Sequence, residues 1–256
     1  AGGKLTGVTV PYGIKEIGGS AFADNDSLTR VNLPAGVTVI GNKAFNDCDR
    51  LINVTMGEGV EIIGSRAFGD CRSLEIITLP QSVTFIGANA FVNCGALTEI
   101  EFGDNIESIG SGAFKKCVML KEITLPESVE VIGEETFKDC ASLAYIEMRG
   151  GIKQLGARAF AGCESCKRIN AEDTKNLTVI ASGLFKDCTA LENTNLFENA
   201  NKIEDGALSG CTSLKSFEIP KTAEYLGKEI FYGCSALKEL SVPFIGKNVS
   251  DLKKVN

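Results

Sequence analysis

Residues 28–48 read LTRVNLPAGVTVIGNKAFNDC, and residues 120–140 read LKEITLPESVEVIGEETFKDC. Both stretches place leucine, a β-branched residue, proline, glycine, phenylalanine and cysteine at the same positions. A phenylalanine recurs every 23 residues from Phe22 to Phe160, and a cysteine follows three residues after most of them. Every proline of the chain also falls at one position of the repeat: Pro11, Pro34, Pro80, Pro126, Pro220 and Pro243. Such a fixed period indicates a tandem repeat array.

Each repeat predicts the same succession of local structures. The L-x-x-V-x-L segment, residues 28–33, favours a short strand, which the following proline ends because it lacks a backbone donor. The V-x-x-I-G segment, residues 37–41, predicts a second short strand turned by glycine. The A-F-x-x-C segment, with Asn42 as N-cap, predicts one or two helical turns. We therefore expect an α/β repeat solenoid, a right-handed superhelix of about ten repeats with a concave parallel sheet.

The repeats predict one domain over residues 1–256, regular across 5–243. Residues 171–208 depart from the pattern through a two-residue insertion and through Thr194, Ala200, Glu204 and Leu208, which replace the expected residue types. We expect this segment to be the loosest part of the stack, or to be adapted to a partner. Residues 244–256 predict a partial repeat or a cap. The chain opens with AGGKL, which lacks a signal core, so we expect a trimmed chain.

Composition excludes several functions. The net charge of −7 argues against nucleic acid, which needs a basic surface, and against anionic membranes. No apolar run approaches the roughly 20 residues that cross a bilayer. The chain has no histidine, which removes His-dependent triads and zinc sites, and no tryptophan. Glu99 and Glu101 share a face, but an open ladder offers no pocket to raise the pKa of either. We expect no catalytic residues, no metal and no cofactor.

The ten cysteines are predicted to be structural. Nine share one inward position of the repeat, and Cys166 replaces a leucine at another. Stacked repeats hold such side chains in parallel, which is poor geometry for disulfides, so we expect buried free thiols. The Cys163–Cys166 pair forms a lone C-x-x-C without the second pair that a zinc site needs.

Two outward surfaces are candidates for a partner. Strand alternation predicts that acidic residues gather in the middle of the concave face beside one tyrosine, which suggests a basic partner, although a solvated face explains the same charges. The residues are Ile76, Glu99, Glu101, Glu122, Tyr145 and Glu147. The second short strand predicts an exposed apolar strip, formed by Val39, Ile62 and Phe85. Strand propensity alone also accounts for that strip.

The two quoted stretches resemble the BspA-like (Treponema-type) leucine-rich repeat family, and the resemblance covers residues 5 to about 243. It implies a bacterial or protist cell-surface protein associated with adhesion to host matrix proteins or other cells. We therefore expect an extracellular, monomeric, non-enzymatic module that binds a protein on its concave face. A structural spacer that projects another domain is the alternative, and glycan binding is a third hypothesis, weakened by the absence of tryptophan.

Overall fold

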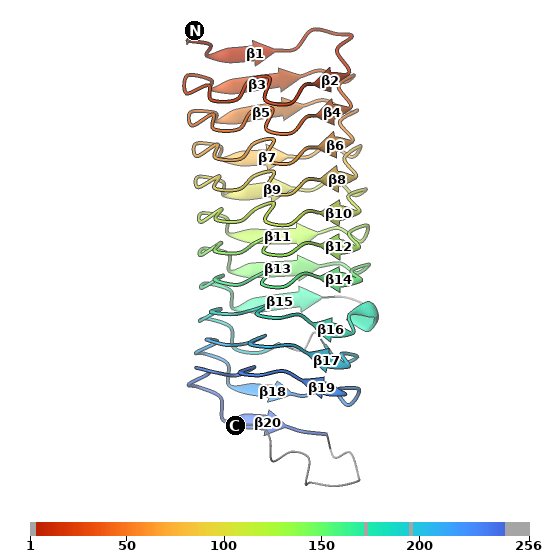
Figure 1. The fold of residues 1–256 in the computed structure, drawn as a ribbon, viewed down its shortest axis with the longest axis vertical. Coiled ribbons are helices and arrows are strands. Elements are labelled where there is room, and N and C mark those ends of the chain that lie inside the picture. The colour runs from red at the N-terminus through yellow and green to blue at the C-terminus, as the bar shows by residue number, and fades with distance from the viewer. Residues whose placement is uncertain (1–3, 172–173, 195–196, 244–256) are drawn as a thin grey trace.

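The computed structural model describes residues 4–171, 174–194 and 197–243. These residues form a parallel β-solenoid of about ten turns, in which each turn lies on the next along the long axis (Figure 1). We call each turn a rung and number the rungs from the N-terminus. The two ends of the described chain lie at opposite ends of the stack. The predicted solenoid of 23-residue units with parallel strands is confirmed.

The L-x-x-V-x-L segments form the first row of strands, which we call the long-strand ladder. Its strands pair in parallel one repeat apart, so that Arg30 lies beside Asn53 and Val31 beside Val54. Alternate residues are exposed and buried, which gives the ladder one outward face. The strands are β1 (Gly7–Thr9), β3 (Arg30–Leu33), β5 (Asn53–Met56), β7 (Ile76–Thr78), β9 (Glu99–Glu101), β11 (Glu122–Leu125), β13 (Tyr145–Met148), β15 (Arg168–Ala171), β18 (Ser216–Glu218) and β20 (Glu239–Ser241).

The V-x-x-I-G segments form the second row, the short-strand ladder, as predicted. Seven of its strands are hydrogen-bonded in one sheet and the last three in another. The second residue of almost every strand is buried and the first points outward. The strands are β2 (Glu16–Ile17), β4 (Val39–Ile40), β6 (Ile62–Ile63), β8 (Phe85–Ile86), β10 (Ser108–Ile109), β12 (Val131–Ile132), β14 (Gln154–Leu155), β16 (Val179–Ile180), β17 (Lys202–Ile203) and β19 (Tyr225–Leu226).

The A-F-x-x-C segments are turns, so the prediction of helical turns and of an α/β class is wrong. Lys43 and Asp47 have φ values of 57° and 59°, and the left-handed backbone at both positions is incompatible with a helix. The N–H groups of Lys43, Phe45 and Asp47 instead donate to carbonyl oxygens of the next rung, each at 2.8 Å. Asn42 likewise accepts from the N–H of Ser65 in the next rung. Within the described residues the one helical element is the 3₁₀ turn η1 (Thr174–Asn176).

The core is a column of phenylalanine rings that runs through most of the stack. From Phe22 to Phe185 successive rings are stacked, with centroids 5.2–5.7 Å apart and planes within 10° of parallel. Offset stacking at this distance is favourable for aromatic rings. Leu208 interrupts the column, and Phe231 packs against Phe217 instead. The rings that the 23-residue period aligns thus form the continuous core of the solenoid.

Both ladders have a break that adjoins or includes residues 171–208, and the long-strand ladder is also divided between β5 and β7 and between β9 and β11. No strand of the long-strand ladder is described between β15 and β18, and the two sheets of the short-strand ladder meet between β14 and β16. The buried hydroxyl of Thr194 has no hydrogen-bond partner there among the described residues. That this segment is the loosest part of the stack stays a prediction, as does the single domain over 1–256. The predicted partial repeat or cap, residues 244–256, lies outside the described residues.

Candidate protein-binding face

The predicted acidic residues lie together on the outward face of the long-strand ladder. Ile76 pairs with Glu99 across β7 and β9, and Glu122 pairs with Tyr145 across β11 and β13. Ile76 is 50% exposed, the glutamates of β9 and β11 are exposed, and Tyr145 is half-buried. The six candidate residues therefore occupy four consecutive rungs of one surface. Their role in binding stays a prediction.

A shallow depression of about 260 Å³ lies at the centre of this acidic surface. It opens where the ladder is divided between β9 and β11, which are not hydrogen-bonded in one sheet. Glu99, Glu101 and Glu122 line it together with Asp104, and Arg149 is its one cation. Arg149 already pairs with Glu147, at 3.3 Å between Nε and Oε1. The depression is thus a strongly negative surface, and we call it the acidic depression.

Two of these charged residues were not predicted from the sequence. Asp104 and Arg149 follow the ends of β9 and β13, where strand alternation no longer fixes the direction of a side chain. In the repeat, Gly103 stands where most units carry proline, and this departure could have drawn attention to Asp104. The acidic depression therefore extends beyond the strands into the loops that follow them.

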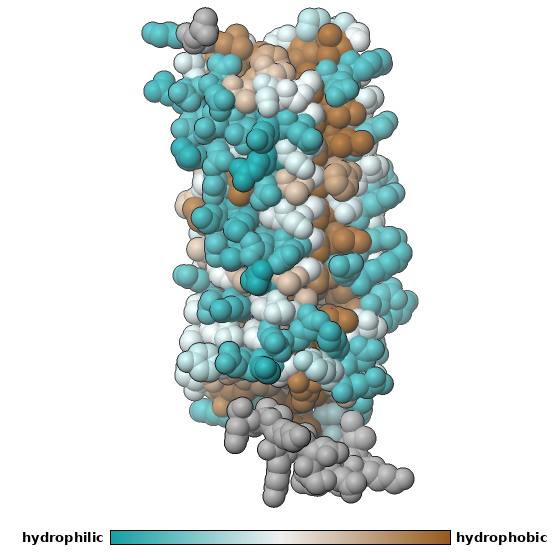
Figure 2. Space-filling view, in the orientation of Figure 1, coloured by the Kyte–Doolittle hydropathy of each residue, from teal (hydrophilic) through white to brown (hydrophobic). Residues whose placement is uncertain are grey.

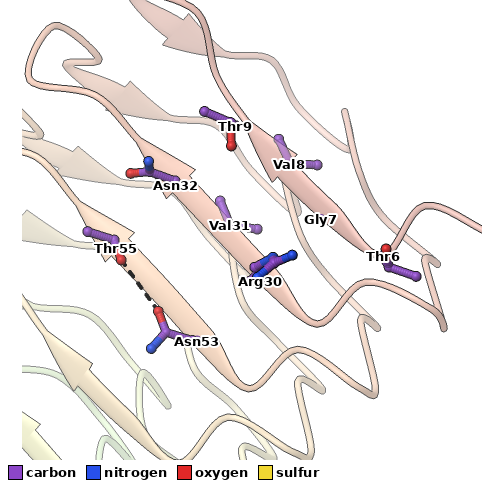
Figure 3. Close-up of a pocket in the computed structure, with 9 residues that line it drawn as sticks. All are labelled: Thr6, Gly7, Val8, Thr9, Arg30, Val31, Asn32, Asn53 and Thr55. Atoms are coloured by element: carbon purple, nitrogen blue, oxygen red, sulfur yellow. Dashed lines mark hydrogen bonds between the residues drawn. The ribbon is translucent and has the colours of Figure 1, made fainter.

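A second, larger hollow of about 600 Å³ lies on the same face at rungs 1 to 3. Figure 3 shows the residues that line it, which come from β1, β3 and β5 and the residue before β1. Gly7 occupies the outward position that Arg30 and Asn53 occupy in the next two rungs. The hollow thus forms where one rung lacks an outward side chain, a feature that was not predicted from the sequence either.

The predicted apolar strip lies on the short-strand ladder. Val39, Ile62 and Phe85 face outward on three paired strands, and Ile62 and Phe85 are 39% and 42% exposed. Figure 2 shows hydrophobic side chains in a column over the short strands, beside the more hydrophilic long-strand face. In the next rung the equivalent outward residue is Ser108, which is polar, so the apolar strip is limited to three rungs. Its role as an interface stays a prediction.

One charged cluster braces the turn side of the stack. The Glu135 carboxylate pairs with Lys115 at 2.6 Å, with Arg158 at 2.9 Å and with Lys138 at 3.1 Å. These partners, Lys115 first, lower the pKa of Glu135 to about 2 despite its partial burial. Because the three cations come from three consecutive rungs, the cluster ties neighbouring rungs together. All four charges are partnered, so we assign the cluster a structural role.

The cysteines form a hydrogen-bonded column of their own. All ten are free, and nine of them are buried. Nine of the thiols, all except Cys166, donate to the carbonyl oxygen of the phenylalanine position one rung earlier, as from Cys117 Sγ to Phe91 O at 3.2 Å. Burial raises the pKa of Cys48 to about 11 and that of Cys140 to about 12. Cysteine thus supplies a small buried side chain that also donates a hydrogen bond, and its thiol is held in the unreactive protonated form.

We expect the native thiols to resist alkylation. Iodoacetamide at pH 8 should modify Cys234 slowly, because it alone is only partly buried, and should spare the other nine. Intact-mass measurement against time would count the modified thiols, and a guanidinium-unfolded sample should take up ten groups as the control. Rapid modification of several thiols in the native protein would contradict the buried column. Fewer than ten modified thiols in the fully unfolded sample would show that some cysteines form disulfides.

The described part of the chain holds neither a metal-binding cluster nor a membrane-spanning helix. No group of three or more Cys, Asp or Glu side chains is arranged there to hold a metal ion, including Cys163 and Cys166. No helix among residues 4–171, 174–194 and 197–243 is long and apolar enough to cross a membrane. The outward face of the long-strand ladder therefore remains the main candidate site.

Comparisons with known proteins agree with this architecture. A model of the BspA type leucine rich repeat region matches residues 1–121 and 107–238, with six copies. The pneumococcal vaccine antigen PcpA has a similar structure, with a TM-score of 0.52 and 20% identity over 93% of this chain and 78% of that one. A Bacteroides ovatus leucine-rich repeat protein gives a TM-score of 0.44 and 24% identity over 94% and 82% of the two chains. None of the curated proteins matches significantly.

A leucine-rich repeat protein of T. pallidum gives a TM-score of 0.44 and 25% identity over 92% of this chain and 79% of that one. At these identities the likeness to solved structures concerns the fold. The two matched ranges together cover residues 1–238, which is most of the chain.

Proposed function

Because the chain belongs to the BspA-type leucine-rich repeat family, we propose that it is a surface-exposed module that binds a basic protein on its long-strand face. Solenoids of this family generally serve as protein-interaction scaffolds without catalytic activity. The observation that carries the proposal is the acidic depression. Glu99, Glu101, Asp104 and Glu122 converge on it, and its one arginine is already paired with Glu147.

Electrostatics explains why this surface favours a basic partner. Like charges on adjacent strands repel one another, which is unfavourable in the free protein. A lysine or arginine of a partner would relieve that repulsion and speed association. Ile76 and Tyr145 lie beside Glu99 and Glu122 on the neighbouring rungs, and a partly exposed aromatic side chain is a common anchor in protein interfaces. The face thus combines charge that steers a partner with apolar surface that holds it.

Charge reversal tests the proposal. Glu99→Lys, Glu101→Lys and Glu122→Lys together should weaken binding to a purified matrix protein by about tenfold or more, because attraction becomes repulsion. Biolayer interferometry against a panel of purified extracellular matrix proteins would measure this. The matched control reverses Glu61, Glu107 and Glu224, which are exposed at the position before the short strands. It changes the net charge equally and should alter binding less than about twofold.

The outcomes separate the alternatives. If no protein of the panel binds the wild-type chain, the proposed function is wrong. A spacer would keep its projecting role in both triple variants, so an unchanged adhesion phenotype in cells carrying the Glu99, Glu101 and Glu122 variant would favour the spacer. Selective binding on a glycan array would favour the glycan hypothesis. Antibody labelling of intact cells of the source organism would test the extracellular location, which is part of the proposal.

A further inference from the structure

We propose that the hollow at rungs 1 to 3 is a second subsite on the same face, which receives a carboxylate of the protein that binds the acidic depression. We call it the Arg30 hollow. The inference rests on the proposed function, because it concerns the same partner. It adds a requirement on that partner, which must carry an acidic group at a fixed distance from its basic one.

The shape of the Arg30 hollow depends on Gly7. A Cβ placed on Gly7 would lie 3.2 Å from Arg30 Nε and 3.3 Å from Arg30 Cγ, so the arginine side chain lies against the bare backbone of β1. The Arg30 side chain, from Cγ to Nε, thereby lies along rung 1, although the residue stays exposed. Thr9 and Asn32 stand on the neighbouring outward positions of the same two strands (Figure 3).

The chemistry of the lining suits an anion. Arg30 is its one charged residue, and no carboxylate lines the hollow. None of the described residues forms an ion pair with Arg30, Arg50 or Arg168, whereas Arg66, Arg72, Arg149 and Arg158 each have an acidic partner. A guanidinium presents parallel N–H donors that match a carboxylate.

Neutral donors complete the subsite. Thr55 Oγ1 donates to Asn53 Oδ1 at 3.4 Å, and Asn53, whose amide nitrogen can still donate, lines the hollow (Figure 3). Asn32, Thr6 and Thr9 add further amide and hydroxyl groups. The Arg30 hollow therefore offers one positive charge surrounded by hydrogen-bond donors.

The surroundings favour a single carboxylate over a polyanion. The chain carries a net charge of −7, and the acidic depression lies on the same face. A sulfated glycan or a nucleic acid that reached Arg30 would be repelled by the glutamates further along the ladder. A protein segment with separate acidic and basic groups meets attraction at both subsites. β3, which carries Arg30, and β11, which carries Glu122, are four rungs apart, or about 19 Å at roughly 4.8 Å per rung.

Three labelled synthetic peptides of equal length test this spacing. The bipolar peptide carries two glutamates and three lysines, separated by six uncharged residues that span about 20 Å when extended. The basic peptide replaces its glutamates by glutamine, and the acidic peptide replaces its lysines by glutamine. Fluorescence anisotropy at low ionic strength would measure the Kd of each for the wild-type chain and for Arg30→Gln. Arg168→Gln is the matched control, because Arg168 is exposed on β15 of the same face.

We expect the bipolar peptide to bind the wild-type chain at least about fivefold more tightly than the basic peptide. Arg30→Gln should remove this difference and leave the Kd of the basic peptide within about twofold, whereas Arg168→Gln should preserve the difference. Gly7→Thr, which places a side chain where the Arg30 side chain lies, should act like Arg30→Gln.

Each other result has a definite meaning. If the basic peptide binds but the bipolar peptide binds no better, or if Arg30→Gln leaves the difference intact, the carboxylate subsite is wrong and the proposed function stands. If neither the bipolar nor the basic peptide binds the wild-type chain, both the carboxylate subsite and the proposed function are wrong. If a heparin oligosaccharide binds more tightly than the bipolar peptide, and Arg30→Gln abolishes its binding, the ligand of the hollow is a polyanion and the carboxylate assignment is overturned.

Discussion

Phe114→Ala is expected to lower the free energy of unfolding by about 3–5 kcal/mol. Phe114 is fully buried, and its ring lies 5.2 Å from that of Phe91 and 5.4 Å from that of Phe137, nearly parallel to both. Phe102 packs edge-on against it at 5.8 Å. Truncation removes these contacts and leaves a cavity that neighbouring rungs cannot close without breaking their own hydrogen bonds. The effect therefore measures how strongly the ring column holds the stack together.

Denaturant unfolding followed by circular dichroism would measure this loss, because the chain contains no tryptophan to report by fluorescence. Phe85→Ala is the matched control, since it makes the same chemical change on a side chain that is 42% exposed, and it should cost under about 1 kcal/mol. Phe22→Ala should fall between the two, because Phe22 stacks against Phe45 and is only partly buried. Equal losses for Phe114 and Phe85 would show that the rings do not form a common core.

The position of the core could be predicted from the sequence because the period is so regular. Side chains 23 residues apart occupy equivalent places in successive rungs. If the repeats stack, Phe45, Phe68 and Phe91 must therefore point toward the same axis of the solenoid, as they do. Outward residues followed from strand alternation in the same way, which is why Glu99 and Glu122 were placed on one face correctly.

The turn segments were predicted wrongly, and the sequence contains the signal that corrects them. The position two residues after each phenylalanine is left-handed in most rungs, and it is rich in aspartate, asparagine and glycine, as at Asp47, Asn93 and Gly162. These residue types tolerate a left-handed backbone better than others do. Apolar spacing alone could not show this, because a turn that bonds to the next rung and a short helix bury the same side chains.

The candidate site was only partly predictable for a different reason. Arg149 and Asp104 lie in loops after the strands, and the periodicity of a strand says nothing about where a loop side chain points. The Arg30 hollow depends on the missing side chain of Gly7. The equivalent positions of the first three repeats are Gly7, Arg30 and Asn53, but this order of residue types does not show that the arginine side chain lies over the glycine. Individual side-chain directions therefore required the structure.

The glycine of the V-x-x-I-G segment also has a role that the sequence did not show. It was expected to turn the chain, which requires freedom in φ. At Gly110 the backbone is not left-handed, and a Cβ there would lie 2.7 Å from Ala88 N and 2.9 Å from Ile86 O. Both atoms belong to the backbone of the preceding rung, and Gly110 N–H donates to Ile86 O at 2.8 Å. Glycine is required here because two rungs approach too closely for any side chain.

Gly110→Ala is accordingly expected to destabilise the protein by about 3 kcal/mol or more. The added methyl group meets backbone atoms on the adjacent rung, which cannot move aside as a flexible side chain would. Rungs 4 and 5 must separate locally, and the hydrogen bond from Gly110 to Ile86 is lost or lengthened. Because each rung is held mainly by its neighbours, separation at one point weakens the stack on both sides. Denaturant unfolding and the thermal midpoint of the variant would measure the loss.

Gly95→Ala is the matched control for this prediction. A Cβ on Gly95 would meet no atom within 4 Å, and its backbone is not left-handed. The same substitution there should be neutral or should stabilise the protein by about 0.4–1 kcal/mol, because alanine restricts the unfolded chain. The two variants thus differ in sign as well as in size, although both add one methyl group to neighbouring repeats. If Gly110→Ala lowered the stability no more than Gly95→Ala does, rungs 4 and 5 could not lie as close together at Gly110 as the structure places them.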